Sequence, residues 1–205
     1  MGVAGVILAA EHAARLDRPK ALLDFRGQPF VVQILQALEA LEVKLRVVVL
    51  GPDAARIRPA LAPYDCLIVE TTLAGGSIEA LRAALTLLQP LQPSGVLAWP
   101  VGLPHVRVDT IERLLEVYRR TRTPAVVPRF AERYGEPVIW DQALFAELAV
   151  ARATDAPGGG AEAAVLERHA SEFVALNVDD PAVIDELETP EDYERLVRQI
   201  NRDLY

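Results

Sequence analysis

Short runs of apolar residues alternate along the chain with longer segments in which apolar residues recur at helical spacing. The apolar runs are VAGVILAA (3–10), LRVVVL (45–50), CLIVE (66–70), GVLAWP (95–100) and AVVP (125–128). Segments with the period of a helix follow the first four runs, at 28–42, 53–61, 77–89 and 108–121. Strands that are apolar throughout are typical of a parallel sheet covered by helices on both faces. The pattern therefore predicts a three-layer, doubly wound α/β fold.

The pattern changes after about residue 128. It predicts a short strand in GEPVIW (135–140), helices in DQALFAELAV (141–150) and AAVLERH (163–169), and a last strand in FVALNV (173–178). A terminal helix in TPEDYERLVRQI is expected to have Thr189 as its N-cap and Pro190 at its first position. The glycine run 158–160 is expected to be a mobile loop, because too little chain follows it for another core. We therefore expect one domain over residues 1–205.

Composition and charge narrow the classes of partner. Of the 205 residues, 51% are apolar and 24% are charged, as in globular proteins, and the net charge is -8. This charge argues against nonspecific binding to nucleic acid or to an anionic membrane, since both need a basic surface. No apolar stretch reaches the roughly 18 residues of a membrane span, and the first residues do not resemble a secretory signal, so we expect a cytoplasmic location. The one cysteine, Cys66, allows no intramolecular disulfide and is expected to be a buried thiol.

Candidate chemistry follows the first apolar run. Ligands of open α/β sheets bind at the carboxyl ends of the strands, so the segment after residue 10 is the first place to look. Arg15 and Lys20 lie in that segment, and both cations could reach one phosphate group. Taken alone, such a pair is more often two solvated surface charges than a phosphate site.

The segment VILAAEHAARLDRPKALLDFRGQPFVVQILQAL (6–38) resembles the signature of the MobA-like nucleotidyltransferases, which reads approximately LAAG-x-S-x-R-M-G-x-x-K-x-L-L-x-x-x-G-x-P. The matching positions, without a gap, are Leu8, Ala9, Ala10, Arg15, Lys20, Leu22, Leu23, Gly27 and Pro29. The resemblance continues in AGGSIEALRAAL (74–85), in RYGEPVIW (133–140) and in VDDPAVIDELETPEDYERL (178–196). It therefore extends over nearly the whole chain.

The resemblance implies a mostly parallel, Rossmann-like nucleotide-binding sheet, and it implies that the chain catalyses nucleotidyl transfer. In this family a nucleotidyl group is transferred from a nucleoside triphosphate to a phosphate- or hydroxyl-bearing small molecule, and pyrophosphate is released. For this chain the resemblance favours CTP or GTP as the donor and a molybdopterin-type cofactor as the acceptor. Arg15 and Lys20 would act as the catalytic cations on the triphosphate. The nucleotide-binding residues would be Leu8, Ala9, Ala10, Glu11, His12, Gly76 and Ser77. Carboxylates, with Glu188 as the candidate metal ligand, would hold Mg²⁺ in a cleft formed by residues 10–20, 75–77, 100–104 and 186–190.

Several positions depart from the family signature. Glu11 and Asp17 replace loop glycines, which adds negative charge beside a triphosphate site, and Ala13 replaces the loop serine. The metal-binding aspartate of the family's D-x-P motif aligns with Gly102 in AWPVGLPHV. Mg²⁺ requires oxygen ligands, which glycine has no side chain to supply.

Two interpretations explain these substitutions. In one, Glu188, Glu136 or Glu11 supplies the missing oxygen and transfer survives, since phosphoryl chemistry depends mainly on positioning and electrostatics. Glu186 and Glu188 stand where the family has two aspartates and keep the charge on a longer arm. In the other, the chain is a pseudoenzyme that binds a nucleotide or a protein partner without turnover. The sequence leaves the choice open.

The histidines, Ser77 and the two tryptophans are expected to have mainly structural roles. His12, His105 and His169 lack the spacing of a zinc helix and are expected to be exposed or to cap helices, although His12 could donate a hydrogen bond within the loop. Ser77 is expected either to cap the following helix or to contact the base. Trp99 and Trp140 are expected to pack in or beside the sheet. Walker, G-x-G-x-x-G and G-x-S-x-G motifs do not occur in the sequence.

Overall fold

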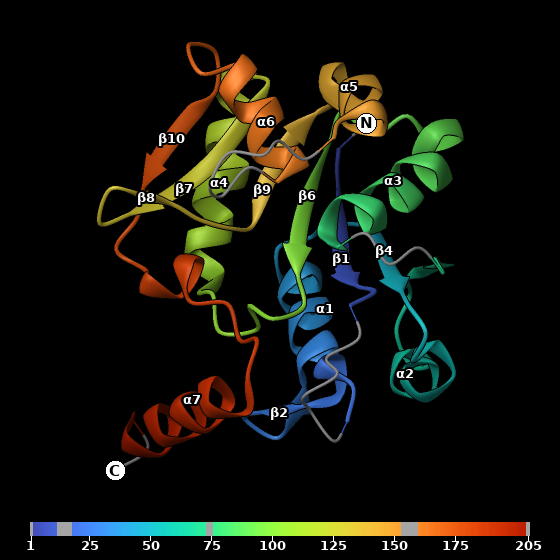
Figure 1. The fold of residues 1–205 in the computed structure, drawn as a ribbon, viewed down its shortest axis with the longest axis vertical. Coiled ribbons are helices and arrows are strands. Elements are labelled where there is room, and N and C mark those ends of the chain that lie inside the picture. Colours follow the sequence, from blue (N-terminus) through green and yellow to red (C-terminus); the bar gives the residue numbers. More distant parts are fainter. Residues whose placement is uncertain (1, 12–17, 73–75, 153–159, 204–205) are drawn as a thin grey trace.

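A twisted sheet forms the centre of the computed structural model, which describes residues 2–11, 18–72, 76–152 and 160–203 (Figure 1). Its strands have the order β10-β7-β9-β6-β1-β4-β5, with β8 paired to β7. Their bounds are β1 (Val3–Ala9), β4 (Leu45–Leu50), β5 (Leu67–Glu70), β6 (Gly95–Pro100), β7 (Ala125–Phe130), β8 (Arg133–Tyr134), β9 (Val138–Asp141) and β10 (Val174–Asn177). A separate hairpin consists of β2 (Asp24–Phe25) and β3 (Gln28–Pro29).

Most of the sheet is parallel. β1 pairs in parallel with β4 and β6, β4 with β5, and β7 with β10, whereas β9 runs antiparallel to both β6 and β7. In the register, Val6 of β1 lies opposite Val47 of β4 and Ala98 of β6. The carboxyl ends of β1, β4 and β6 therefore meet at one edge of the sheet, the lower edge in Figure 1.

Helices cover both faces because alternate strand residues point to opposite sides. Ile7 and Val48 belong to one apolar cluster, and Val6 and Val47 belong to the other. The first cluster is covered by α1 (Phe30–Ala40), α2 (Ala54–Leu61) and α4 (Val108–Thr121), and the second by α3 (Gly76–Leu88), α5 (Phe145–Val150) and α6 (Ala161–Arg168). The predicted three-layer, doubly wound, mostly parallel Rossmann-like fold is confirmed.

The remaining elements are short turns and the last helix. The 3-10 turns are η1 (Lys20–Leu22), η2 (Gln89–Leu91), η3 (Gln142–Leu144) and η4 (Pro181–Ile184). The last helix, α7 (Pro190–Asp203), lies beyond the carboxyl edge of the sheet and contacts the hairpin, where the Tyr193 hydroxyl donates to the Asp24 carbonyl at 3.1 Å. In the described part of the chain, no helix is long and apolar enough to cross a membrane.

Several local predictions can be compared with these elements. Trp99 and Trp140 are 1% exposed and lie on β6 and β9, as predicted. The first helix begins at Phe30 rather than at residue 28, because residues 28 and 29 pair in the hairpin. Cys66 is half-buried rather than buried, since it precedes the edge strand β5, and the partial burial raises the pKa of its thiol. The single-domain organisation over residues 1–205 stays a prediction.

Candidate nucleotide-binding site

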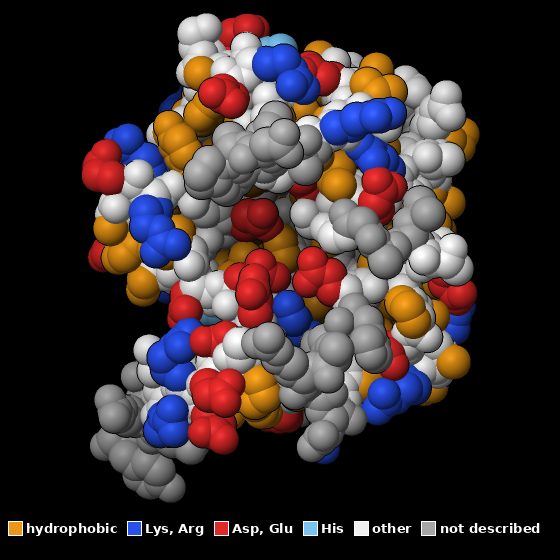
Figure 2. All heavy atoms as spheres, viewed as in Figure 1, with side chains coloured by type: hydrophobic (Ala, Val, Ile, Leu, Met, Phe, Trp, Pro, Cys, Tyr) orange, Lys and Arg blue, Asp and Glu red, His pale blue; other side chains and the backbone are white. Residues whose placement is uncertain are grey.

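Segments that are distant in the sequence meet at the carboxyl edge of the sheet. They surround a small cavity of about 60 Å³, lined by Leu8, Ala10, Glu11, Ser77, Ala80, Pro100, Val101, Glu136 and Glu186. Figure 2 shows this face as a hollow in which acidic side chains gather around a basic one. The described parts of the four segments predicted to form the cleft contribute lining residues to this cavity.

The backbone fixes the start of the loop after β1. The amide of Val101 donates to the carbonyl of Leu8 at 3.0 Å, which holds the end of β6 against the end of β1. A β-carbon added at Gly51, just after β4, would lie 2.0 Å from the carbonyl oxygen of Ala10. Position 51 therefore accepts only glycine without displacing the backbone at Ala10. Leu8 and Ala9 are buried in the sheet, so they contribute backbone and apolar wall rather than polar side-chain contacts.

Lys20 is the buried cation of the site. It begins η1, its side chain is 5% exposed, and its Nζ lies 3.5 Å from Glu11 Oε2 and 3.6 Å from Glu186 Oε1. A buried ammonium is stabilised only when charged partners compensate for its lost hydration. The arrangement therefore joins the loop after β1, the turn η1 and the segment before α7 through one positive charge.

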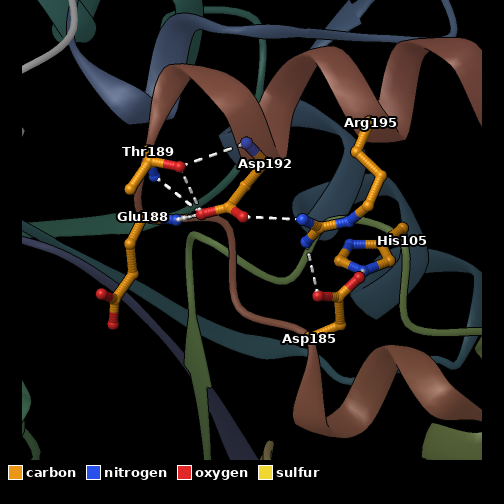
Figure 3. A network of polar contacts seen from close by, with 6 residues as sticks. All are labelled: His105, Asp185, Glu188, Thr189, Asp192 and Arg195. Atoms are coloured by element: carbon orange, nitrogen blue, oxygen red, sulfur yellow. Dashed lines mark hydrogen bonds and ion pairs between the residues drawn. The ribbon is translucent and has the colours of Figure 1, made fainter.

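A capping network holds the segment that carries Glu186 and Glu188 (Figure 3). Asp192 Oδ2 accepts hydrogen bonds from the Thr189 amide at 2.9 Å and from its hydroxyl at 2.8 Å, while the Asp192 amide donates to Thr189 Oγ1 at 3.2 Å. Thr189 is thus the N-cap of α7 and Pro190 is its first residue, as predicted. These hydrogen bonds, of which the bond from the Thr189 side chain has the largest effect, lower the pKa of Asp192 to about 2.

Arg195 extends this network to the segment between η4 and α7. Its guanidinium donates to Asp192 Oδ1 at 2.8 Å and to Asp185 Oδ1 at 2.7 Å (Figure 3). Glu188 lies between them in sequence, but it is exposed and its carboxylate points away from the network. The segment is therefore fixed on both sides of Glu186.

His105 does not have the exposed or helix-capping position that was predicted for it. Its side chain is 11% exposed and neither ring nitrogen has a hydrogen-bond partner among the described residues, so it is neither exposed nor a cap. Asp185 Oδ2 lies 4.0 Å from its Nε2, but burial dominates and lowers the pKa of His105, which favours the neutral ring. His169, in contrast, is the C-cap of α6 as predicted, and its Nε2 lies 2.8 Å from Glu147 Oε2.

Glu136 lies where the small cavity meets a larger one. Its amide donates to the Val183 carbonyl at 2.8 Å, and the Gly135 amide donates to the Pro128 carbonyl at 2.9 Å, so two backbone bonds position the turn before β9. Burial, together with the nearby charges of Glu186, Glu162 and Glu11, raises the pKa of Glu136 to about 8. At neutral pH this carboxyl group is therefore mostly protonated, and the acidic site carries less negative charge than its sequence suggests.

The larger cavity has a volume of about 930 Å³ and lies over the sheet face covered by α3 and α6. Most of the lining is apolar, with Leu81, Val138 and Phe173 among its members. The Ser77 hydroxyl donates to Glu162 Oε1 at 2.6 Å and so links the two helices beside the cavity. Such a concave, mainly apolar space with a few polar groups is typical of a small-molecule site.

The structure describes all the predicted nucleotide-binding residues except His12, and Leu8 and Ala10 line the small cavity. Glu11 and Ser77 line the small cavity, and Gly76 precedes Ser77 with φ at 69°. Ser77 is the second residue of α3 and not its N-cap, so that prediction is wrong, and a contact with the base stays a prediction. Residues 12–17 lie outside the described part of the chain, so the structure does not place His12, Ala13, Arg15 or Asp17.

A family model for the MobA-like NTP transferase domain matches residues 5–173. The chain belongs to this family. It is 34% identical over 119 residues to the bifunctional protein GlmU of Burkholderia multivorans, a match that covers 57% of this chain and 26% of that protein. The chain therefore spans about a quarter of the length of the curated relatives that it matches.

Solved structures agree with the family assignment. Rv0371c from Mycobacterium tuberculosis H37Rv is 28% identical, with a TM-score of 0.78 over 97% of this chain and 99% of that chain. A structure of the Rv0371C complex with manganese from the same organism is 25% identical, with a TM-score of 0.72 and the same coverage. This MobA-like chain thus shares its fold along nearly its full length.

Two functional features could not be found from the family signature. Gly51 looks like an ordinary turn residue in the sequence, and only the approach of Ala10 shows why it is glycine. Glu162 follows the glycine run and pairs with Ser77 across a tertiary contact between α3 and α6. Neither position has a local sequence signal, because both depend on how separate βα units pack.

The carboxylates of the site can hold a divalent cation only if a bound triphosphate supplies further oxygen ligands. Among the described residues, no group of three or more histidine, cysteine, aspartate or glutamate side chains is arranged to hold a metal ion by itself. Mg²⁺ in nucleotide sites usually takes one or two carboxylates and completes its shell with phosphate oxygens and water. Glu11 and Glu186 present such oxygens beside Lys20, which fits Mg²⁺ bound together with a triphosphate.

Proposed function

We propose that this chain transfers a nucleotidyl group from a nucleoside triphosphate, with CTP or GTP favoured, to a phosphate- or hydroxyl-bearing small molecule, with release of pyrophosphate. A molybdopterin-type cofactor is the favoured acceptor, from the resemblance to the molybdenum-cofactor branch of the family. The observation that carries the proposal is Lys20. It is a buried cation at the carboxyl edge of a nucleotide-binding sheet, at the lysine position of the family signature.

The reaction forms one bond and breaks one. An acceptor oxygen forms a bond to the α-phosphorus, the bond from the α-phosphorus to the bridging α–β oxygen breaks, and pyrophosphate leaves with that oxygen. A hydroxyl acceptor also loses its proton to solvent. Lys20 would stabilise the charge that develops on the phosphate oxygens, since such catalysis is mainly positioning and electrostatics. Arg15, which the structure does not describe, is proposed as the second cation on the triphosphate.

Glu186 and Glu188 are proposed to hold Mg²⁺ together with the triphosphate. The metal would neutralise phosphate charge in the transition state. The manganese complex of Rv0371C supports a divalent cation in this fold. Glu136 would be mostly neutral at pH 7, which reduces the repulsion that an anionic nucleotide meets at the floor of the site.

The larger cavity is proposed as the acceptor site. Its volume of about 930 Å³ falls within the range of small-molecule pockets, and it shares Leu8, Ser77 and Glu136 with the small cavity. Arg133 lies in its lining and makes no ion pair with the described residues, so it can meet an anionic group of the acceptor. The apolar wall suits the ring system of a pterin better than a bare sugar.

The test uses CTP and GTP labelled at the α-phosphate, with molybdopterin as acceptor and Mg²⁺ present. We expect the label to appear in the acceptor while pyrophosphate is released in equal amount. Lys20→Ala should abolish the transfer, and Lys44→Ala should leave it unchanged, since Lys44 is the other lysine of the chain and is exposed before β4. Nucleotide binding without pyrophosphate release, with this acceptor and with sugar phosphates, would contradict the proposal and support binding without turnover.

A further inference from the structure

A further cavity lies at the amino edge of the sheet, the upper edge in Figure 1, opposite the candidate nucleotide-binding site. Its volume is about 340 Å³, which falls within the range of small-molecule sites. The segments that lead from α1 to β4, from η2 to β6 and from α4 to β7 meet there. The lining residues are Gly2, Val3, Glu42, Val43, Lys44, Leu45, Pro93, Ser94, Tyr118, Arg119 and Arg122. None of them lines the small or the larger cavity of the candidate site.

Positive charge gathers around this cavity, although the chain as a whole is acidic. Lys44 immediately precedes β4, and Arg119 and Arg122 come from the end of α4. The side chains of Lys44 and Arg119 make no hydrogen bond or ion pair with any residue that the structure describes. Glu42, the acidic residue of the lining, forms no ion pair with these three cations. The charge of the cavity wall is therefore positive and is not neutralised by neighbouring carboxylates in the described part of the chain.

Arg122 is held at the cavity wall by packing. It is the C-cap of α4 with φ at 51°, in the left-handed region that glycine adopts most easily. Its guanidinium carbon lies 5.2 Å from the centroid of the Tyr118 ring, a cation–π contact. The Tyr118 hydroxyl in turn donates to the Ser94 carbonyl and, at 2.6 Å, to Asp141 Oδ2. The ring that positions the guanidinium is thus itself fixed by hydrogen bonds.

Ser94 adds a hydroxyl that the fold does not use. Its Oγ is buried and has no hydrogen-bond partner among the described residues. Its backbone groups, in contrast, are paired: the amide donates to the Gly2 carbonyl at 3.2 Å, and the carbonyl accepts from the Gln142 amide at 3.1 Å. A buried hydroxyl without a partner is unfavourable. Because Ser94 lines the cavity, a turn of its side chain toward a ligand oxygen there would supply the missing hydrogen bond.

We infer that this cavity binds a phosphorylated small molecule at a site separate from the nucleotide site. The phosphate group would lie among Lys44, Arg119 and Arg122, because the arginine fork matches two phosphate oxygens and lysine adds a further positive charge. The Ser94 hydroxyl would donate to another oxygen, and apolar lining residues such as Leu45 would contact the carbon skeleton. The net charge of -8 opposes a long polyanion such as a nucleic acid, so the ligand is small.

The probe is inorganic phosphate, whose binding is followed in two-dimensional NMR spectra of the isotope-labelled chain. The amides of Lys44, Ser94 and Arg122 should shift along a saturable curve. Sodium chloride at equal ionic strength should not reproduce these shifts, because screening does not fill a site. The amides around Lys20 are followed in the same spectra, so phosphate bound at the nucleotide site is recognised separately. Shifts confined to the surroundings of Lys20, or reproduced by sodium chloride, would overturn the inference.

The double variant Arg119→Gln with Arg122→Gly should weaken phosphate binding at this cavity at least tenfold, because two charge-assisted contacts are lost. Glycine suits the φ of 51° at position 122, so this variant should fold. Arg120→Gln is the matched control, since Arg120 is exposed in the same last turn of α4 but does not line the cavity. It should bind phosphate as the unmodified chain does. Equal losses in the two variants would overturn the inference and assign the effect to general surface charge.

Ser94→Ala tests the hydroxyl separately. It should weaken phosphate binding severalfold and leave Tm unchanged, because the hydroxyl makes no hydrogen bond within the described part of the fold. Unchanged phosphate affinity would overturn the assignment of this hydroxyl to the ligand. The binding of CTP or GTP should stay the same in all these variants. The inference therefore stands or falls independently of the proposed nucleotidyl transfer.

Discussion

The amide of Leu187 lies 3.1 Å from the carbonyl oxygen of Gly102 and donates a hydrogen bond to it. The bond brings together the two segments that the family resemblance assigns to metal binding, one of which has glycine at the position of the expected acid. It also positions the carboxylate of Glu186 beside Lys20. The charge balance of the site therefore depends on the contact between the loop after β6 and the segment before α7.

Lys20→Ala is expected to weaken the binding of a nucleoside triphosphate at least tenfold. Loss of one charge-assisted contact is worth about 1.5–3 kcal/mol, and alanine supplies no positive charge in place of the buried ammonium. Equilibrium dialysis with labelled CTP and GTP measures the change. Lys44→Ala is the control and should bind normally; equal affinity of the two variants would remove Lys20 from the site.

Asp192→Ala is expected to destabilise the chain by about 1 kcal/mol through loss of the cap of α7, which lowers Tm by about 2–4 °C. The effect depends on pH. Because the folded pKa of about 2 lies below the ordinary value of 3.8, this carboxylate stabilises the fold above pH 3.8, and the contribution is lost as the pH falls through about 2.

Calorimetric unfolding between pH 2 and pH 6 tests this prediction. The Tm values of the unmodified chain and of Asp192→Ala should converge toward pH 2. Glu191→Ala, in the same turn of α7 and exposed, serves as the control with little change in Tm. A difference between Asp192→Ala and the unmodified chain that stays constant down to pH 2 would show that the carboxylate charge plays no part.

Glu136→Gln is expected to stabilise the chain at alkaline pH. The folded pKa of about 8 lies above the ordinary value of 4.5, so the folded state binds this proton more tightly than the unfolded state does. Stability that is fully present below pH 4.5 is therefore lost as the pH rises toward 8. An amide does not ionise, so Tm at pH 8.5 should rise by about 2–4 °C, as about 1 kcal/mol produces in a chain of this size.

Comparing the Tm of Glu136→Gln with that of the unmodified chain at pH 4.5 is the internal control. Glu136 is protonated in the folded state at this pH, so the two Tm values should be equal. Glu112→Gln, an exposed residue of α4, should show no pH-dependent gain. A gain of equal size at both pH values would indicate better packing of the amide and not relief of a buried charge.

Gly51→Ala is expected to disturb the start of the nucleotide loop. Its β-carbon would meet the Ala10 carbonyl oxygen at 2.0 Å, and relief of such an overlap requires a backbone shift that costs about 1–3 kcal/mol. Chemical denaturation should show this loss, and triphosphate affinity should fall with it. Gly2→Ala is the control, because nothing lies within 4 Å of its added β-carbon. Unchanged stability of Gly51→Ala would mean that Ala10 can move without strain.

Much of the fold could be predicted because the central strands are buried on both faces. In β6, all six residues are buried, so the strand is visible in the sequence as a continuous apolar run. Two-residue strands such as β2 and β8 were missed, since a period cannot be detected in two positions. The antiparallel direction of β9 also depends on its neighbours, β6 and β7, and not on its own sequence.

The site was predictable only where it follows the family signature. Lys20 was found from its spacing after the first strand, and the structure places it at the carboxyl edge of the sheet. The packing of Glu186 against Gly102 is a tertiary relationship, so the sequence showed a missing acid without showing which side chain lies beside that position. The raised pKa of Glu136 likewise depends on folding, first through burial of the carboxyl group and then through the charges of three nearby carboxylates.

Calorimetric titration of the purified chain with CTP, GTP, ATP and UTP, each with and without Mg²⁺, is the most direct test of the proposed nucleotide site. We expect CTP or GTP to bind more tightly than the other nucleotides, and binding to strengthen when Mg²⁺ is present because Glu186 and Glu188 hold the cation with the triphosphate. Failure of every nucleotide to bind, even with Mg²⁺, would contradict a nucleotidyltransferase site at the carboxyl edge of this sheet.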